Sequence, residues 1–228
     1  MVEQAGRRVA TGSGVVVASR AEEPGGEAIS YVLTAAHILD GKQGAELFVR
    51  FTGTYAVRGK LAAIVLRQGD SESIDLALLR VPGIAVPPAS FPAGDRVRLG
   101  EEILVVGFPW GKRLGLFSGI VSQVPVDARG EPMEGEGVEQ TIVVDAAAAK
   151  GVSGGGVFRE ANGSLVGVVE GYQTASIAVK DRSQTYAVKV PMPGETFVVP
   201  ITRIRRFLVE AGLKESEGSP EREEDRED

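Results

Sequence analysis

The sequence contains no cysteine and a single histidine, His37, among 228 residues. The lack of cysteine excludes disulfides, thiolate catalysis and cysteine-containing zinc sites, and one histidine excludes a histidine-rich metal site. We therefore expect no metal and no cofactor. A reaction that needs an imidazole base has only one residue in this chain that can supply it.

Clustered basic residues and long apolar runs are also missing. Phosphate binding needs grouped Lys and Arg, so nucleic acid is not an expected partner. No apolar stretch reaches the length of a membrane span, and residues 1–8 contain no hydrophobic signal core. As written, the sequence predicts a cytoplasmic protein without a membrane partner. A periplasmic or secreted location stays open if a signal peptide has been removed.

Most of the negative charge lies at the C-terminus. The net charge is −6, and residues 214–228 alone carry eight acidic and three basic side chains. This segment has no apolar residues to bury, so it predicts a disordered acidic tail. The role of the tail, and whether the chain is a fragment of a larger protein, stay open at this point.

Turn-forming residues are abundant, with 30 glycines and 12 prolines. Short β-rich runs separated by such residues recur on both sides of a proline-rich stretch at 82–96. The expected strands are 14–18, 31–34, 47–51, 62–66 and 74–81 in the first half, and 102–107, 116–124, 140–144, 156–159, 165–170, 185–190 and 196–199 in the second. The pattern predicts an all-β fold of two packed six-stranded antiparallel barrels.

The predicted domain comprises residues 1–213. Its parts are a first barrel at about 8–84, a linker at 85–98, a second barrel at 99–200 and a helix at 201–211. We expect Thr202 to cap that helix and Gly212 to end it. Two long loops, 125–138 and 172–195, are predicted, the second with a possible hairpin inside; their roles stay open.

A glycine-framed serine is the strongest chemical signal. Gly151-Val152-Ser153-Gly154-Gly155 matches Gly-x-Ser-x-Gly, a pattern of exposed nucleophilic serines. The α/β-hydrolase order needs a histidine after the serine, and none follows Ser153. The subtilisin order needs an aspartate before the histidine, and the first aspartate is Asp40. Only the order His, Asp, Ser of chymotrypsin-type enzymes remains.

Asp75 is the best partner for His37. It is a lone charge in the apolar run 74–79, where a carboxylate is costly unless it is hydrogen-bonded or paired. Asp40 is too close to His37 in the chain, and Asp145 is expected to shape the substrate pocket. The other aspartates considered, Asp70, Asp95 and Asp127, lie in polar or turn-like segments.

These residues predict a complete acyl-transfer site. Ser153 is the nucleophile, His37 the general base and acid, and Asp75 the residue that orients the imidazole. The backbone N–H groups of Gly151 and Ser153 are expected to form the oxyanion hole.

Several further segments follow one family pattern: 11–14, 33–37, 74–79, 106–111, 117–122, 145–155 and 197–201. Together they resemble the trypsin-like serine peptidases of the chymotrypsin superfamily, most closely the bacterial HtrA/Deg catalytic domain, over about residues 10–210. The resemblance implies a serine endopeptidase that hydrolyses protein or peptide substrates. No PDZ-like segment follows the predicted helix.

Two positions depart from that family. Val152 stands where Asn or Asp is usual, which excludes activation of the trypsin type through a buried carboxylate. Gly156 stands where Pro is frequent. Val152 also leaves open whether the oxyanion loop is formed at rest.

The substrate pocket is expected between residues 146–149 and 168–172. Its candidate lining residues are Ala146, Ala147, Ala148, Val169, Glu170 and Gly171. The small side chains favour a small or medium aliphatic substrate residue. The alternatives are a catalytically silent peptide-binding module and a protease component of a larger intracellular assembly. The oligomeric state stays open.

Overall fold

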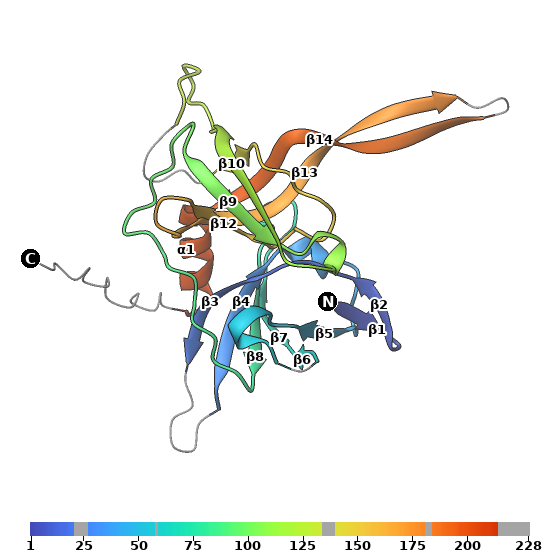
Figure 1. Cartoon of the computed structure of the whole chain (residues 1–228), viewed down its shortest axis with the longest axis vertical. Helices are drawn as coiled ribbons and strands as arrows, with labels where there is room; N and C mark the ends of the chain where they lie inside the picture. Colours follow the sequence, from blue (N-terminus) through green and yellow to red (C-terminus); the bar gives the residue numbers. More distant parts are fainter. Residues whose placement is uncertain (21–26, 58, 134–139, 181–183, 214–228) are drawn as a thin grey trace, which may run out of the picture.

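The computed structural model describes residues 1–20, 27–57, 59–133, 140–180 and 184–213. Its regular structure is mostly β-strand, in two halves that are followed by one α-helix (Figure 1). The expected acidic tail at 214–228 and part of the expected loop 125–138 lie outside the described residues.

The first half contains two four-stranded sheets. One has the order β2-β1-β5-β6, formed by Arg7–Ala10, Val2–Gln4, Glu46–Val49 and Leu61–Ala62. The other has the order β3-β4-β8-β7, formed by Val15–Arg20, Ile29–Thr34, Ala77–Pro82 and Ile64–Gln68.

This half differs in detail from the six-stranded barrel that the sequence predicts. The expected strand 62–66 is divided at Ala63, since β6 pairs with β5 whereas β7 pairs with β8. The β1–β2 hairpin was not predicted. Its turn is formed by Ala5 and Gly6, both with positive φ, which is the backbone that tight hairpin turns require.

The second half is a closed six-stranded barrel, which confirms the predicted barrel there. Its order is β10-β11-β14-β13-β12-β9, formed by Gly115–Gln123, Ile142–Val144, Thr185–Pro200, Leu165–Lys180, Gly156–Arg159 and Glu102–Gly107. The side chains inside are mostly valine and isoleucine, including the fully buried Ile103, Val105, Val121 and Ile142. Between β8 and β9 the proline-rich chain forms no helix or strand.

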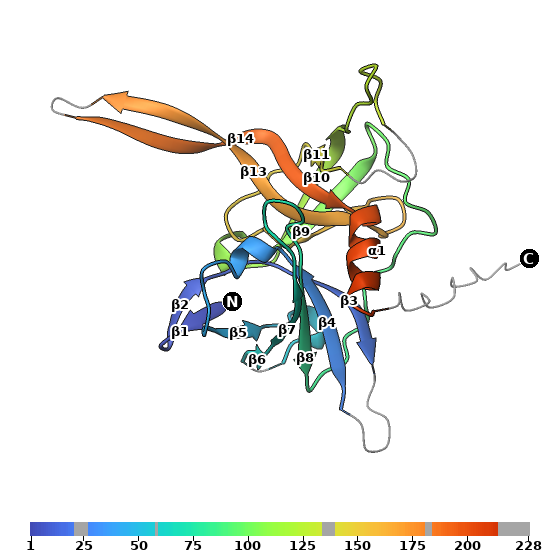
Figure 2. The ribbon, with the colours of Figure 1, turned by 180° about the vertical axis from the view of Figure 1, so that it is seen from behind.

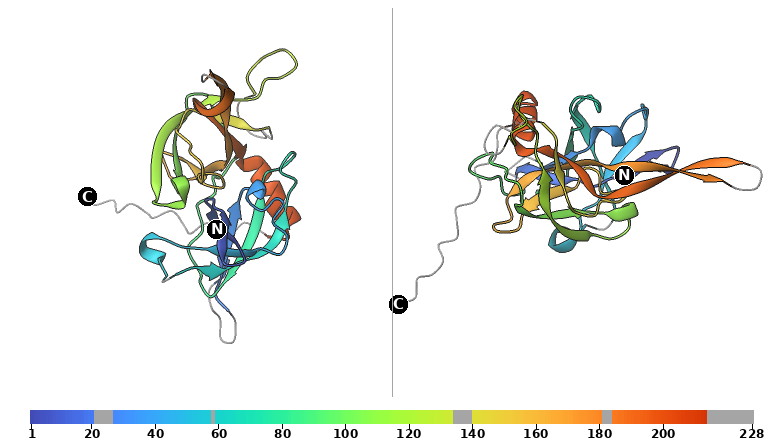
Figure 3. Two further views of the ribbon diagram at one scale, coloured as in Figure 1. Left: turned by 90° about the vertical axis from the view of Figure 1, so that its right-hand side faces the viewer. Right: turned by 90° about the horizontal axis from the view of Figure 1, so that it is seen from above.

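The segment 172–195 is mostly strand and not a long loop, and the possible hairpin predicted inside it is present. β13 and β14 are each 16 residues long, and they stay paired out to Lys180 and Thr185. Their outer parts form a two-stranded ribbon that projects from the barrel (Figure 3). The alternation in Ser176-Ile177-Ala178-Val179 favours extended backbone, so the chain continues the barrel strands instead of looping between them.

Helix α1 (Ile201–Glu210) follows β14 directly and lies where the two halves meet (Figure 2). Its buried residues are Ile201, Ile204, Phe207 and Leu208, at the spacing the sequence predicts. The prediction that Thr202 caps the helix is wrong, because the helix begins immediately after Pro200 and Thr202 is already inside its first turn. Gly212 ends the helix as expected, with φ of +76°.

Candidate active site

His37 lies on a short 3-10 helix, η1 (Ala36–Ile38), that follows β4. The neighbouring residues Ala35, Ala36 and Ile38 are buried and fix the backbone, whereas the His37 side chain is 43% exposed. Its Nδ1 is 2.6 Å from Asp75 Oδ2, and its backbone N–H donates to Asp75 Oδ1 at 2.8 Å. Both carboxylate oxygens therefore bind one residue, which fixes the ring relative to its own backbone.

Asp75 lies just before strand β8, not inside a strand as the sequence prediction had it. A turn precedes it, closed by the N–H of Ile74 donating to Asp70 O at 2.7 Å. Arg203 of α1 donates to Ser73 O in the same turn. The side chain of Asp75 is only 3% exposed. The turn lets the carboxylate face His37, because a residue within β8 would have its direction set by the pleat.

Asp75 raises the pKa of His37 above its ordinary value. The largest cause is the hydrogen bond with Asp75, and partial burial of the ring opposes it. The negative charges of Asp75, Asp40 and Glu170 raise the pKa further. The net effect favours the imidazolium, the form that a general base acquires when it accepts a proton.

Ser153 lies in a tight turn bounded by two glycines with positive φ, Gly151 at +97° and Gly154 at +83°. A Cβ on Gly151 would lie 2.7 Å from Phe108 O, and one on Gly154 would lie 2.9 Å from Ala35 N. These close approaches require glycine. They bring the serine turn against the residues that lead into His37. Within the described residues, no hydrogen bond joins the Ser153 hydroxyl to His37.

Backbone hydrogen bonds hold the carbonyl groups that precede Gly151 and Ser153 in the same turn. The Lys150 carbonyl accepts from the N–H of Trp110 at 2.6 Å, and the Val152 carbonyl accepts from Gly155 at 2.7 Å. No peptide in the described chain is cis, so the N–H of Gly151 and of Ser153 points away from these carbonyls. Across the described residues, neither N–H donates to a protein acceptor. Two amides are thus left available for a developing oxyanion.

Val152 is completely buried in the core of the second barrel. Its side chain packs with the barrel valines, at a position where an acidic residue would need a charged partner. Apolar burial therefore anchors the serine turn in this chain, and no ion pair is needed there.

The family model described as "Trypsin-like peptidase domain" matches residues 12–168. This chain belongs to the trypsin-like peptidase family. The match covers the segments that carry His37, Asp75 and Ser153.

Curated relatives extend the comparison. The chain is 28% identical to a "Probable periplasmic serine endoprotease DegP-like" from Hahella chejuensis over 191 residues. The aligned region covers 84% of this chain and 33% of that protein. The chain therefore spans about a third of the length of that relative.

Solved structures share the fold of this trypsin-like domain. The serine endoprotease from Yersinia pestis superposes with a TM-score of 0.63 at 16% identity, over 92% of this chain and 60% of that one. The HtrA-type protease AlgW with tripeptide superposes with a TM-score of 0.59 at 22% identity, over 89% of this chain and 56% of that one.

The predicted pocket residues of this trypsin-like domain differ in how far they are exposed to solvent. Ala146 is buried in the barrel core, Ala147 is exposed and Ala148 is half-buried. On the other side, Val169 is buried, and Glu170 and Gly171 lie at an irregularity in the pairing of β13 with β14. Of the three alanines, only Ala147 and Ala148 therefore have solvent-accessible surface of any size.

Glu170 is electrostatically linked to the candidate triad. Burial is the main cause that raises its pKa, and the nearby charge of Asp75 raises it further. The Thr141 hydroxyl donates to Glu170 Oε2 at 3.4 Å and opposes the shift. Glu170 is therefore a second carboxyl whose protonation depends on the active-site charges.

Ser13 lies in the segment 11–14, which the sequence analysis assigns to the family pattern without a role for this residue. In the structure Ser13 joins the two halves: its hydroxyl donates to Gly151 O at 2.7 Å and accepts from the N–H of Phe108 at 2.8 Å. Its backbone N–H donates to Ser153 O at 2.8 Å. The pattern Thr-Gly-Ser-Gly indicates a turn-like polar segment, and no signal in it shows that Ser13 supports the nucleophile turn.

Proposed function

We propose that this chain is a serine endopeptidase domain that cleaves protein or peptide substrates through an acyl-enzyme. In this proposal Ser153 is the nucleophile, His37 the general base and acid, and Asp75 the orienting carboxylate. The observation that carries it is the pair of hydrogen bonds between Asp75 and His37. The serine turn lies beside this pair, since Gly154 packs against the backbone of Ala35, two residues before His37.

The chemistry follows from these groups. The Ser153 hydroxyl attacks the substrate carbonyl while His37 Nε2 takes its proton; the C–O bond forms as the carbonyl π electrons move to oxygen. His37 then protonates the leaving amine as the C–N bond breaks. Water, deprotonated by His37, next attacks the acyl-enzyme and releases the carboxylic acid and Ser153.

The free N–H groups of Gly151 and Ser153 support the oxyanion role in this proposal. Donors of this kind contribute about 3–4 kcal/mol each to the transition state in serine peptidases. The carbonyls that hold the turn, Lys150 O and Val152 O, accept hydrogen bonds on the opposite side. Both donors are therefore free to bind a developing oxyanion in this proposal.

Substrate choice is assigned to residues 146–149 and 168–172. The exposed Ala147, the half-buried Ala148 and the buried Val169 favour a small or medium aliphatic residue before the scissile bond. Glu170, half-buried at the other wall, adds a group that is neutral or charged depending on pH.

The test is covalent labelling with a fluorophosphonate, followed by cleavage-site profiling on a peptide library. We expect stoichiometric labelling of the native protein, none in Ser153→Ala, and cleavage after small aliphatic residues. Ser122→Ala is the control, because Ser122 lies on β10 and donates to Val143 O. Equal cleavage by the native protein and Ser153→Ala would overturn the mechanism.

One observation favours a second candidate, a silent peptide-binding module. In the described residues the Ser153 hydroxyl makes no hydrogen bond to His37, although such contacts often form only in the substrate complex. Peptide binding without any fluorophosphonate labelling would select this candidate.

We also propose an extracytoplasmic location, because the curated relative is named a periplasmic protease. In the described residues no helix is long and apolar enough to span a membrane. Cell fractionation with an antibody to the chain tests the location. Recovery only from the cytoplasm would instead support the location that the sequence alone predicts.

A further inference from the structure

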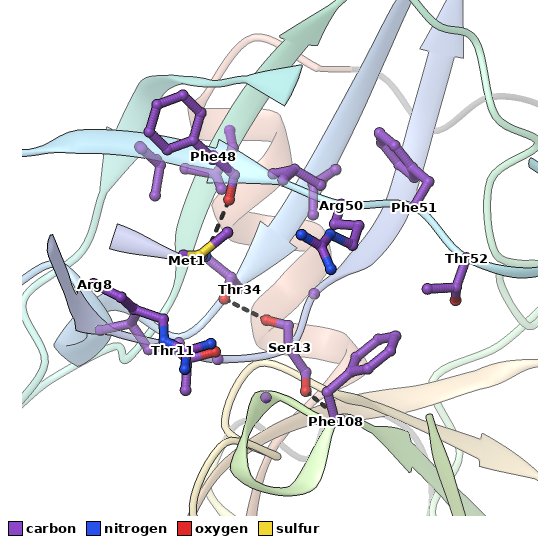
Figure 4. A pocket seen from close by; sticks show the side chains of 18 of the residues that line it. Met1, Arg8, Thr11, Ser13, Thr34, Phe48, Arg50, Phe51, Thr52 and Phe108 are labelled. Atoms are coloured by element: carbon purple, nitrogen blue, oxygen red, sulfur yellow. Dashed lines mark hydrogen bonds between the residues drawn. The ribbon is translucent and has the colours of Figure 1, made fainter. Parts of the chain in front are cut away.

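A cavity of about 300 Å³ is lined by residues from both four-stranded sheets of the first half and, at one side, by Phe108, Gly111 and Lys112 of the second half (Figure 4). This size is at the lower end of the range for small-molecule sites. The deeper wall is apolar and includes Val16, Val32, Leu47, Val49, Phe51 and Leu79. Neither His37, Asp75 nor Ser153 lines the cavity, so it is separate from the candidate active site.

The charged residues of the lining all have the same sign. Arg8, Arg50 and Lys112 line the cavity, and no aspartate or glutamate does. All three residues are exposed to solvent. Figure 4 shows Arg50 extending from the end of β5 into the space between Phe51 and Ser13.

These cations also lack carboxylate partners. Within the described residues, none of the three forms an ion pair, whereas Lys60, Arg67, Arg80, Arg159 and Arg205 each pair with an acidic side chain. A cluster of like charges without counter-ions raises the local concentration of anions.

The inner polar groups are already occupied. The Thr34 hydroxyl donates to Ser13 O at 2.6 Å, and the Ser13 hydroxyl donates to Gly151 O. These two buried hydroxyls therefore have protein partners, and the valine, leucine and phenylalanine side chains around them favour an apolar group. The site thus combines an apolar interior with a cationic entrance.

We propose that this cavity binds a medium-chain carboxylate, with the alkyl chain among the apolar side chains and the carboxylate at the guanidinium group of Arg50. Binding would act on the active site through Ser13. This residue lines the cavity and also holds the serine turn through Gly151 O and Ser153 O. A ligand that displaces or stiffens Ser13 changes the support of the proposed nucleophile.

The test is isothermal titration of sodium decanoate, below its micelle concentration, into the full chain carrying Ser153→Ala. This variant removes the proposed chemistry, so binding is measured independently of peptidase activity. We expect decanoate to bind, with an affinity that falls as salt rises. Decanol and decyltrimethylammonium, which share the chain but lack the negative charge, should bind at least about fivefold more weakly.

Two charge reversals locate the site. Arg50→Glu should weaken decanoate binding by at least about fivefold, since it removes a cation and adds a repelling charge. Arg7→Glu is the matched control, because Arg7 is an exposed arginine on β2 beside Arg8 but does not line the cavity. It should leave the affinity within about twofold, apart from screened long-range effects.

The single tryptophan provides a second readout. Trp110 adjoins Gly111, which lines the cavity, so decanoate should change its fluorescence with the same midpoint as the calorimetric titration. The proposal is overturned if decanoate does not bind, if decyltrimethylammonium binds equally well, or if Arg7→Glu and Arg50→Glu have the same effect. It is also overturned if a short acetylated peptide ending in valine binds more tightly with the same Arg50 dependence, since a peptide terminus would then be the occupant.

In the native protein, decanoate should also change the rate of fluorophosphonate labelling. Binding that leaves this rate unchanged would overturn the coupling through Ser13. A native protein that never labels, but whose Ser153→Ala form binds decanoate, would instead refute the proposed peptidase function and leave the cavity assignment standing.

Discussion

The two oxygens of Asp75 bind different parts of His37, one the ring and the other the backbone N–H. A neutral amide in place of the carboxylate keeps the shape of this contact but loses its charge. It also presents an N–H₂ group toward Nδ1, which favours the tautomer that lacks a proton there.

Asp75→Asn is therefore expected to lower kcat by about 10⁴-fold, the size of the effect known for such a substitution in a serine peptidase triad. The pKa of His37 should fall, because its hydrogen bond with Asp75 is the largest cause that raises it. Since His37 is the only histidine, one imidazole signal in an NMR titration measures this pKa directly. An unchanged pKa would contradict the assigned pairing.

The same shift fixes the pH dependence of stability. The folded pKa of His37 lies above that of the unfolded chain, so its contact with Asp75 stabilises the native state fully below about pH 6.5. That contribution is lost as pH rises through the folded pKa. Peptidase activity has the opposite trend, because the general base must be neutral before it can accept a proton.

Glu170 offers a separate test of the charges at the site. Glu170→Gln should lower the pKa of His37 by less than Asp75→Asn does, since Glu170 contributes the smallest of the causes that act on it. The acidic limb of the pH–rate profile should move to lower pH accordingly. Glu160→Gln, at an exposed position outside the site, is the control and should leave the profile in place.

At the scale of elements, the sequence predicts those strands and helices whose apolar residues alternate or recur at a regular local spacing. The strands β9 and β12 and the buried face of α1 agree with the prediction because their apolar periodicity is uninterrupted. The order of histidine, aspartate and serine in the chain selects the chymotrypsin-type design. The position of Asp75 as a lone charge in an apolar run then selects it as the partner of His37.

Other elements depend on contacts that local patterns do not contain. The sequence predicts a possible hairpin within 172–195 but not its continuity with the barrel strands, because Pro191, Pro193 and Gly194 interrupt the second strand and such residues usually end strands. Asp75 was assigned to a strand because its neighbours are apolar, although a turn closed by Asp70 holds it. The cavity in the first half depends on how two sheets pack, which no single segment specifies.

The outer ribbon is expected to be dispensable for folding. Its large apolar side chains, among them Ile177, Val179, Tyr186 and Val188, are 44–50% exposed and pack against neither barrel. Deleting residues 176–189 and joining the paired Ala175 and Val190 through Asn-Gly should change Tm by less than a few degrees, because that dipeptide forms a tight hairpin turn. Thermal unfolding followed by circular dichroism measures this, and a loss of cooperative unfolding would show that the ribbon is part of the core.

At the scale of the whole molecule, the two halves share one hydrophobic cluster. Leu33 and Leu76 of the first half pack in the same cluster as Leu165 and Val199 of the second, and α1 contributes Phe207 to it. The half-buried Arg67 of β7 also pairs with Glu210 of α1 at 2.5 Å. Neither half can therefore unfold without exposing apolar surface of the other, so a single cooperative transition is expected.

Phe207→Ala tests this coupling, because Phe207 is 1% exposed and removing a buried phenylalanine ring costs about 3–5 kcal/mol. Hydrogen exchange should show the slowest amides of β4 and of β13 losing protection by the same free energy, since both strands depend on the shared cluster. Val209→Ala is the matched control on the same helix: Val209 is 69% exposed, so its loss should change stability by less than about 0.5 kcal/mol. If Phe207→Ala lowered protection in β13 alone, the halves would be unfolding independently. The turn that carries Asp75 would then be stable without the helix, and α1 would brace only the barrel it follows.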